Sequence, residues 1–173
     1  TVVRIQRKSI LLHSSNGPEI TFIDGGGYAR GIICNGKNNS TIEGFTIRNC
    51  SGNGGGGMVN SHSSPQVINC IFENNQAEQE YYYTASGGGV LNNASSATFE
   101  DCIFKNNAAE YSGGAIYNKN FSAVTILNCE FMSNTAYKGG AISNSSLSTA
   151  TIVNSQFSSN FATYFGGAIY LVE

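Results

Sequence analysis

A short motif of one phenylalanine, one asparagine and one alanine recurs along this chain, always at the same internal spacing. Four segments carry it and read FENNQA, FKNNAA, FMSNTA and FSSNFA, starting at Phe72, Phe104, Phe131 and Phe157. A second motif, a glycine block followed by an apolar residue, starts at Gly55, Gly87, Gly113, Gly139 and Gly166. The phenylalanines are 32, 27 and 26 residues apart, and the glycine blocks 32, 26, 26 and 27. Because two independent markers keep step and record the same insertion, the chain is built from internal repeats.

Aligning the repeats predicts which positions face inward. Three aligned sets are apolar or small: Ile42, Val67, Phe99, Ile126 and Ile152; Ile47, Phe72, Phe104, Phe131 and Phe157; and Phe45, Cys70, Cys102, Cys129 and Ser155. Two sets repeat asparagine: Asn75, Asn107, Asn134 and Asn160, preceded loosely by Asn49 or Cys50; and Asn60, Asn92, Asn118 and Asn144. A further set holds Asn69, Asp101, Asn128 and Asn154. Asparagine tolerates left-handed turn backbone, and identical amides can stack into ladders.

The repeats predict an all-β parallel β-helix of roughly six to seven turns. Turns of about 26 residues place equivalent strands about 4.8 Å apart, and each turn buries its apolar face only against its neighbours. TIEGFTI from Thr41 fits the later turns, and TFIDGGG from Thr21 is a shorter, degenerate one. The leucine pattern of leucine-rich repeats and the Trp-Asp signature of propellers are absent. We expect residues 1–173 to form a single segment, part of a longer chain or assembly.

The glycine blocks are expected to be structural. None is followed by the Lys-Ser or Lys-Thr pair of a phosphate-binding loop, and they recur once per turn. Paired glycines let the backbone turn with positive φ, after which an Ile or Val begins a new inward-facing strand.

Composition narrows the function classes. Gly, Asn and Ser, with 21 residues each, supply over a third of the 173 residues and argue against a helical bundle. The formal net charge of −2 gives no electrostatic reason to expect nucleic acid. No apolar stretch is long enough to span a membrane, and TVVRIQRKSI is no signal peptide. Few Lys and Glu beside many Asn, Ser and Gly favour an extracellular or cell-surface location.

The FxxNxA and GGAI motifs together resemble the repeats of chlamydial polymorphic outer-membrane proteins, and more broadly the right-handed parallel β-helix repeats of microbial surface proteins. The resemblance covers about residues 41–173; GGAI is intact at Gly113, Gly139 and Gly166 and altered at Gly55 and Gly87. It implies a right-handed helix and a role as an adhesin or surface structure.

Cysteines and histidines show no catalytic or metal-binding pattern. Cys70, Cys102 and Cys129 share one inward position and are expected to form a stack of buried thiols. The sequence leaves open whether Cys34 and Cys50 pair. The cysteine spacings differ from those of zinc sites, and neither His13 nor His62 lies in a catalytic motif. We expect no metal and no cofactor.

Carboxylates are the main test for an enzyme, because a glycosidase needs two across one cleft and a calcium-assisted lyase needs several. Glu100 and Asp101 adjoin, and Glu43 occupies the Glu100 position two turns earlier. Asp101, however, replaces Asn in its aligned set, which indicates a structural role. Arg48, Glu73 and Lys105 alternate in sign at another position and are expected to pair on the solvent face. We therefore expect no catalytic residues.

The longer repeat carries the best candidate for a binding site. Its excess of about six residues falls within NQAEQEYYYTASG, from Asn75 to Gly87, which includes Glu78, Glu80, Tyr81, Tyr82 and Tyr83. Adjacent tyrosines can contact sugar rings or protein surfaces, or can instead fold down as packing.

The sequence thus favours a non-enzymatic extracellular or cell-surface β-helix segment that serves as a stalk, filament subunit or adhesin. Expected partners are neighbouring segments end to end, and a host-surface protein or glycan. The alternative is a β-helix protein that binds or cleaves polysaccharide.

Overall fold

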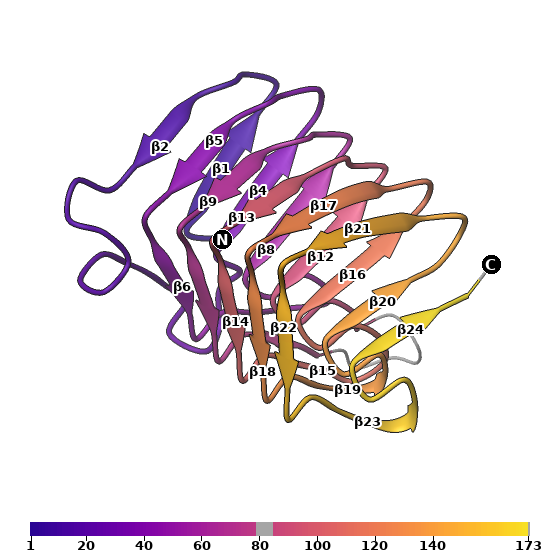
Figure 1. Cartoon of the computed structure of the whole chain (residues 1–173). Helices are drawn as coiled ribbons and strands as arrows, with labels where there is room; N and C mark the ends of the chain where they lie inside the picture. The colour runs from indigo at the N-terminus through magenta and orange to yellow at the C-terminus, as the bar shows by residue number, and fades with distance from the viewer. Residues whose placement is uncertain (79–84, 173) are drawn as a thin grey trace.

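The computed structural model describes residues 1–78 and 85–172. In this part the chain winds into a parallel β-solenoid with four sheets, each built from one strand per turn (Figure 1). Each complete turn visits the sheets in the order A, B, C and D, and every strand pairs in parallel with its equivalents in the turns before and after it. The all-β parallel architecture expected from the repeats is confirmed.

Within the described residues, sheet A has seven strands and sheet B has six. The strands of sheet A are β1 (Val3–Gln6), β4 (Ile32–Asn35), β8 (Met58–Ser61), β12 (Val90–Asn93), β16 (Ile116–Lys119), β20 (Ile142–Asn144) and β24 (Ile169–Leu171). Those of sheet B are β2 (Leu11–His13), β5 (Thr41–Glu43), β9 (Gln66–Ile68), β13 (Thr98–Glu100), β17 (Ala123–Leu127) and β21 (Thr149–Val153).

Sheet C has six strands and sheet D has five in the described residues. The strands of sheet C are β3 (Phe22–Asp24), β6 (Thr46–Arg48), β10 (Ile71–Glu73), β14 (Ile103–Lys105), β18 (Glu130–Met132) and β22 (Gln156–Ser158). Those of sheet D are β7 (Ser51–Gly52), β11 (Gln76–Ala77), β15 (Ala108–Ala109), β19 (Thr135–Lys138) and β23 (Phe161–Phe165).

The register of the strands confirms the alignment of the repeats. Phe72 lies beside Ile47 and Phe104, and Phe99 lies beside Val67 and Ile126. The degenerate segment TFIDGGG contributes β3, in which Ile23 lies beside Ile47. Equivalent residues are 26 apart at Asn92 and Asn118, and 32 apart at Asn60 and Asn92, where the insertion falls.

Stacked phenyl rings fill the core between sheets B and C. Phe72, Phe104, Phe131 and Phe157 form one column, with centroids 4.9, 4.8 and 4.7 Å apart and planes within 6° of parallel. Phe99 meets Phe72 and Phe104 edge-on. These contacts combine burial of apolar area with the favourable geometries of aromatic pairs.

Two asparagine ladders run through the interior. In sheet A the Nδ2 of Asn60 donates to the Oδ1 of Asn92 at 2.8 Å, and the same bond repeats from Asn92 to Asn118 and from Asn118 to Asn144. A second ladder, at the bend between sheets C and D, joins Asn75, Asn107, Asn134 and Asn160. Because buried amides need partners, each ladder satisfies its members by stacking them. Both predicted asparagine sets are therefore confirmed as interior ladders.

Residues with positive φ mark the corners. The corner between sheets B and C holds Gly44, Asn69, Asp101, Asn128 and Asn154 in left-handed backbone, which agrees with the turn role expected for this set. At the corner between sheets D and A, Gly113 has a φ of 64°. Its neighbour Gly114 is required for space, since a Cβ there would lie 2.2 Å from the Gly140 carbonyl oxygen. The paired glycines are thus structural, but only the first of each pair needs the positive φ.

Candidate functional site

The predicted binding segment lies mostly outside the described residues. Glu80, Tyr81, Tyr82 and Tyr83 belong to residues 79–84, which the structure does not describe. Glu78 is exposed just after β11, and its backbone N–H donates to the Gly52 carbonyl at 3.1 Å. Glu78 is thus still bonded to the preceding turn at the end of sheet D.

A column of tyrosine rings lies along sheet D. Tyr111, Tyr137 and Tyr164 stack with centroids 6.0 and 5.0 Å apart, and Lys138 Nζ lies 3.4 Å from the Tyr111 hydroxyl. That hydrogen bond raises the pKa of Lys138. Because Tyr137 lies between its two neighbours, both of its faces are covered and only its ring edge and hydroxyl remain for a ligand. This column therefore offers polar edges, rather than the open ring faces on which sugars stack.

The carboxylates singled out in the sequence do not converge. Glu43 and Glu100 occupy one register position of sheet B, but Ile68 lies between them. Glu43 Oε2 lies 3.4 Å from His13 Nδ1. Asp101 has a φ of 52° and accepts a hydrogen bond from Asn128 at 3.2 Å. The expected structural role of Asp101 at a corner agrees with this geometry.

The charged set on sheet C extends one turn further than the sequence indicated. Lys105 Nζ pairs with Glu73 Oε2 at 2.7 Å, as expected. Arg48 pairs instead with Asp24 at 2.8 Å, and its guanidinium carbon lies 3.9 Å from the Phe22 ring centroid. The shortness of the TFIDGGG turn concealed the fact that Asp24 aligns with Arg48.

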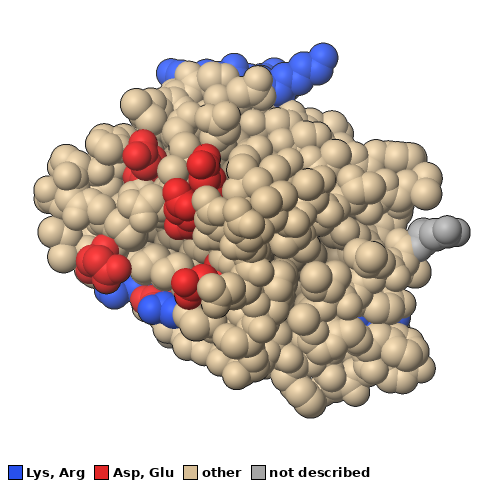
Figure 2. All heavy atoms as spheres, viewed as in Figure 1, with Lys and Arg blue, Asp and Glu red and all other residues tan. Residues whose placement is uncertain are grey.

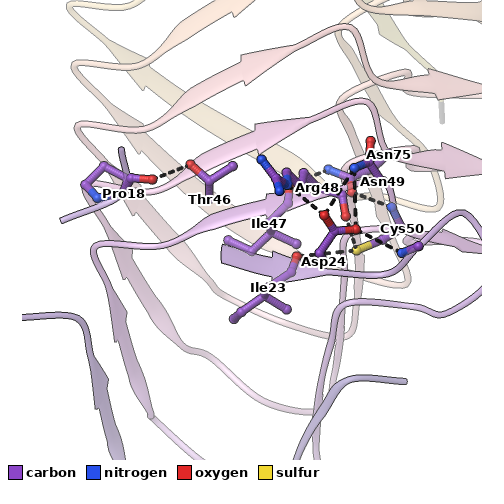
Figure 3. Close-up of polar contacts among 10 residues, drawn as sticks. Pro18, Ile23, Asp24, Thr46, Ile47, Arg48, Asn49, Cys50 and Asn75 are labelled. Atoms are coloured by element: carbon purple, nitrogen blue, oxygen red, sulfur yellow. Dashed lines mark hydrogen bonds and ion pairs between the residues drawn. The ribbon is translucent and has the colours of Figure 1, made fainter. Parts of the chain in front are cut away.

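A polar network fastens this first, irregular turn to the next (Figure 3). Asp24 Oδ1 accepts the Gly26 N–H at 2.9 Å, and Asn49 Nδ2 lies 3.3 Å from Asp24 Oδ2. The Gly26 and Arg48 hydrogen bonds lower the pKa of Asp24. Thr46 donates to the Pro18 carbonyl at 2.8 Å at the other end of β6. These contacts hold the irregular turn in register, and we assign them a structural role.

Cys50, not Asn49, occupies the ladder position before Asn75. Its backbone N–H donates to Asn75 Oδ1 at 3.1 Å, and Asn75 Nδ2 donates to the Ile47 carbonyl (Figure 3). Cys34 lies in sheet A beside Asn60. All five cysteines are buried free thiols, so Cys34 and Cys50 do not pair.

Cys70, Cys102 and Cys129 form the expected column of buried thiols. Burial raises the pKa of Cys70 to about 11 and that of Cys102 well above its ordinary value. A hydrogen bond from the Cys102 thiol lowers the pKa of Cys129. Within residues 1–78 and 85–172, no group of three His, Cys, Asp or Glu side chains is arranged to hold a metal ion.

A polar hollow lies at the corner where sheet A passes into sheet B. It measures 480 Å³ and is lined by Lys37, Asn38, Asn39, His62, Ser63, Ser64 and Ala94. Its floor is well fixed, because Ser63 Oγ donates to the Cys34 carbonyl at 3.0 Å and Asn38 Nδ2 donates to the Gly36 carbonyl at 3.0 Å. Sequence reasoning missed this hollow, since its residues come from different turns and fall outside the repeated motifs.

The molecule's family follows from the comparison with known proteins. The model of the right-handed β-helix region matches residues 3–173.

The chain belongs to this right-handed β-helix family. The match agrees with the four parallel sheets and fixes the handedness that the repeat resemblance implied. No curated protein and no solved structure matches the chain. In the described part of the chain no helix is long and apolar enough to cross a membrane.

Proposed function

We propose that this right-handed β-helix is a non-enzymatic structural and adhesive segment of an extracellular or cell-surface protein. The observation that carries the proposal is the pair of ladders and the phenyl column, which join each turn rigidly to the next. Such a stack is stiff along its axis and displays short outer loops at regular intervals. The resemblance of its FxxNxA and GGAI motifs to polymorphic outer-membrane protein repeats supports the same role.

End-to-end packing is part of this proposal. The outermost turn, β21 to β24, exposes apolar side chains, among them Phe161, Phe165, Leu171 and Val172. Residues 139–172 contain no Asp, Glu, Lys or Arg. A strand edge without charges is well suited to pair with a further parallel turn, from this chain or from a second copy. Particles that lengthen along one axis as concentration rises are the expected result in electron microscopy, and Leu171→Lys should shorten them.

Location is tested separately on intact cells that produce the full protein. A surface protein is labelled by an impermeant amine reagent and is degraded by added protease before the cells are lysed. If the chain is labelled only after lysis, the surface assignment is wrong.

The second candidate is a β-helix that binds or cleaves polysaccharide. It is favoured by the insertion that carries Glu78, Glu80 and Tyr81 to Tyr83, since adjacent tyrosines can contact sugar rings, and by the polar edges of the Tyr137 column. A panel of polysaccharides with and without calcium separates the two functions. Bond cleavage would overturn the non-enzymatic proposal and direct attention to Glu43, Glu100 and Asp101. Retention lost on changing Tyr81 to Tyr83 to Ser, but kept in Tyr28→Ser, would place sugar binding in the insertion.

A further inference from the structure

Basic side chains gather on the corner between sheets A and B. The first corner loop carries Arg7 and Lys8, the second carries Lys37, and the third carries His62. All four are exposed, and in the described part of the chain none of them forms an ion pair. Figure 2 shows Lys and Arg side chains along the upper edge of the molecule and Asp and Glu side chains gathered on the adjoining face. We call Arg7, Lys8, Lys37 and His62 the basic ridge.

No opposing charge lies within these loops. Residues 6–10, 35–40 and 61–65 contain no Asp or Glu, and neither do the later loops of the same corner, 93–97 and 145–148. A row of like charges without counter-charges raises the local concentration of anions, even though the net charge of the whole chain is −2. The positive charge of the ridge is therefore a local property, which the net charge of the whole chain does not reveal.

The ridge has a built polar floor. Lys37 and His62 line the hollow together with Asn39 and Ser64, and Ala94 is the only apolar residue in its lining. Asn39 is tied to the first loop by its backbone N–H, which donates to Ser9 Oγ at 2.9 Å. His62 is tied by its own N–H to the Asn93 carbonyl at 3.0 Å. The Lys37 ammonium, the His62 imidazole, hydroxyls and amides thus face one open space from successive turns.

These groups fit an acidic polysaccharide better than other polyanions. Carboxylates or sulfates would meet the ridge cations, while sugar hydroxyls would hydrogen-bond to Ser64 and Asn39. Successive turns place such groups about 4.8 Å apart, comparable to the length of one sugar unit in an extended chain. A protein that binds a lipid surface inserts apolar side chains, and one that binds single-stranded nucleic acid stacks aromatic rings on the bases. The hollow has no Phe, Tyr, Trp, Leu or Ile in its lining.

We propose that the basic ridge and its hollow bind an anionic polysaccharide through its carboxylate or sulfate groups. In naming this partner we rely on the adhesive function proposed above. The site differs from the acidic positions Glu43 and Glu100 in sheet B, because it lies on the corner loops between sheets A and B and has the opposite charge.

The test measures retention of the whole chain on immobilised heparin, polygalacturonate and neutral dextran over a range of salt. Wild-type protein should bind heparin, polygalacturonate or both, but not dextran, and added salt should weaken the binding. Binding to heparin alone would identify sulfate as the recognised group, and binding to polygalacturonate alone would identify carboxylate. We expect Lys8→Gln/Lys37→Gln to bind about five- to tenfold more weakly, since two charge contacts are lost.

The matched control is Arg4→Gln/Lys105→Gln, which changes the net charge equally on strands β1 and β14, outside both the basic ridge and the Tyr137 column. This control should bind as the wild type does, and all three proteins should melt at similar temperatures. Equal loss in both double variants, or no retention of wild type on either acidic polymer, would overturn the ridge proposal. Binding to anionic phosphatidylglycerol vesicles in place of both polymers would overturn it too. Surface labelling on cells would still report on the adhesive function, so the two failures are distinguishable.

Discussion

Asn60 lies directly beside Cys34 in sheet A, and there the amide ladder stops. The Nδ2 of Asn60 donates to Asn92, but its Oδ1 is buried and has no hydrogen-bond partner. A buried carbonyl without a donor costs free energy, so this ladder carries its one unsatisfied group at its first member. Asn92 and Asn118, further along, are bonded on both sides.

This difference predicts unequal costs within one ladder. Asn92→Val leaves the Asn60 amide and the Asn118 carbonyl without partners, whereas Asn60→Val only transfers the unpaired acceptor to Asn92. We expect Asn92→Val to lower the free energy of unfolding by about 1–3 kcal/mol more than Asn60→Val. Urea unfolding of both variants measures the difference, and equal losses would contradict the ladder account.

The phenyl column predicts a large loss on truncation. Phe104 is fully buried between Phe72 and Phe131. Phe104→Ala should cost about 3–5 kcal/mol, from lost burial and the cavity that remains. Phe121 is 73% exposed, so Phe121→Ala is the matched control and should stay within about 0.5 kcal/mol of wild type. Thermal or chemical unfolding that ranks the two in the opposite order would refute the assigned core.

Close backbone approach predicts that the second glycine of a pair cannot be replaced. A Cβ at Gly114 would lie 2.2 Å from the Gly140 carbonyl oxygen, so Gly114→Ala must displace a neighbouring turn. At Gly17 a Cβ meets nothing within 4 Å, although its φ is +79°. Gly17→Ala should therefore cost only about 1–2 kcal/mol of left-handed strain. We expect Gly114→Ala to lower the melting temperature much further, and similar melting temperatures would disprove the packing argument.

The Asp24 network predicts a dependence of stability on pH. Because its folded pKa is lowered, ionised Asp24 contributes stability above its ordinary pKa of about 3.9, and this contribution is lost as pH falls through the lower folded value. Asp24→Asn should therefore lower the melting temperature at pH 7, and the gap to wild type should narrow in strong acid. A gap that is constant from pH 7 to pH 2 would show that ionisation contributes nothing.

Burial of the thiols predicts slow chemical modification. The pKa of Cys34 is raised to about 12 and that of Cys50 to about 11, so hardly any reactive thiolate is present at pH 8. Cys129, whose pKa is lowered, is protected by burial alone, since it is only 1% exposed. All five cysteines should therefore resist a thiol-specific disulfide reagent in the folded protein and react at once in guanidinium. A thiol that reacts rapidly without denaturant would mark a local opening or a misplaced residue.

The repeats predicted the core because Phe72, Phe104 and Phe131 recur at a nearly constant spacing, and parallel pairing then brings them into register. Asp24 was missed because its turn is shorter than the others, so its alignment with Arg48 appears only once strands β3 and β6 are paired. The basic ridge was missed for a related reason. Its loops lie outside the repeated motifs and differ in length, and loops of different length carry no periodic signal. The insertion with Tyr81 to Tyr83 remains a prediction.

In both ladders the bonds between asparagine side chains run in the same sense, from each turn toward the following one: Asn60 to Asn92, and Asn75 to Asn107. The interior therefore contains two rows of amide dipoles that all point one way. A unit added in reverse orientation would bring carbonyl against carbonyl, or amide against amide, and would reverse the parallel strands as well. Any longer fibre made from this molecule is consequently polar, with two chemically different ends. The rate of growth at one end need not match the rate at the other.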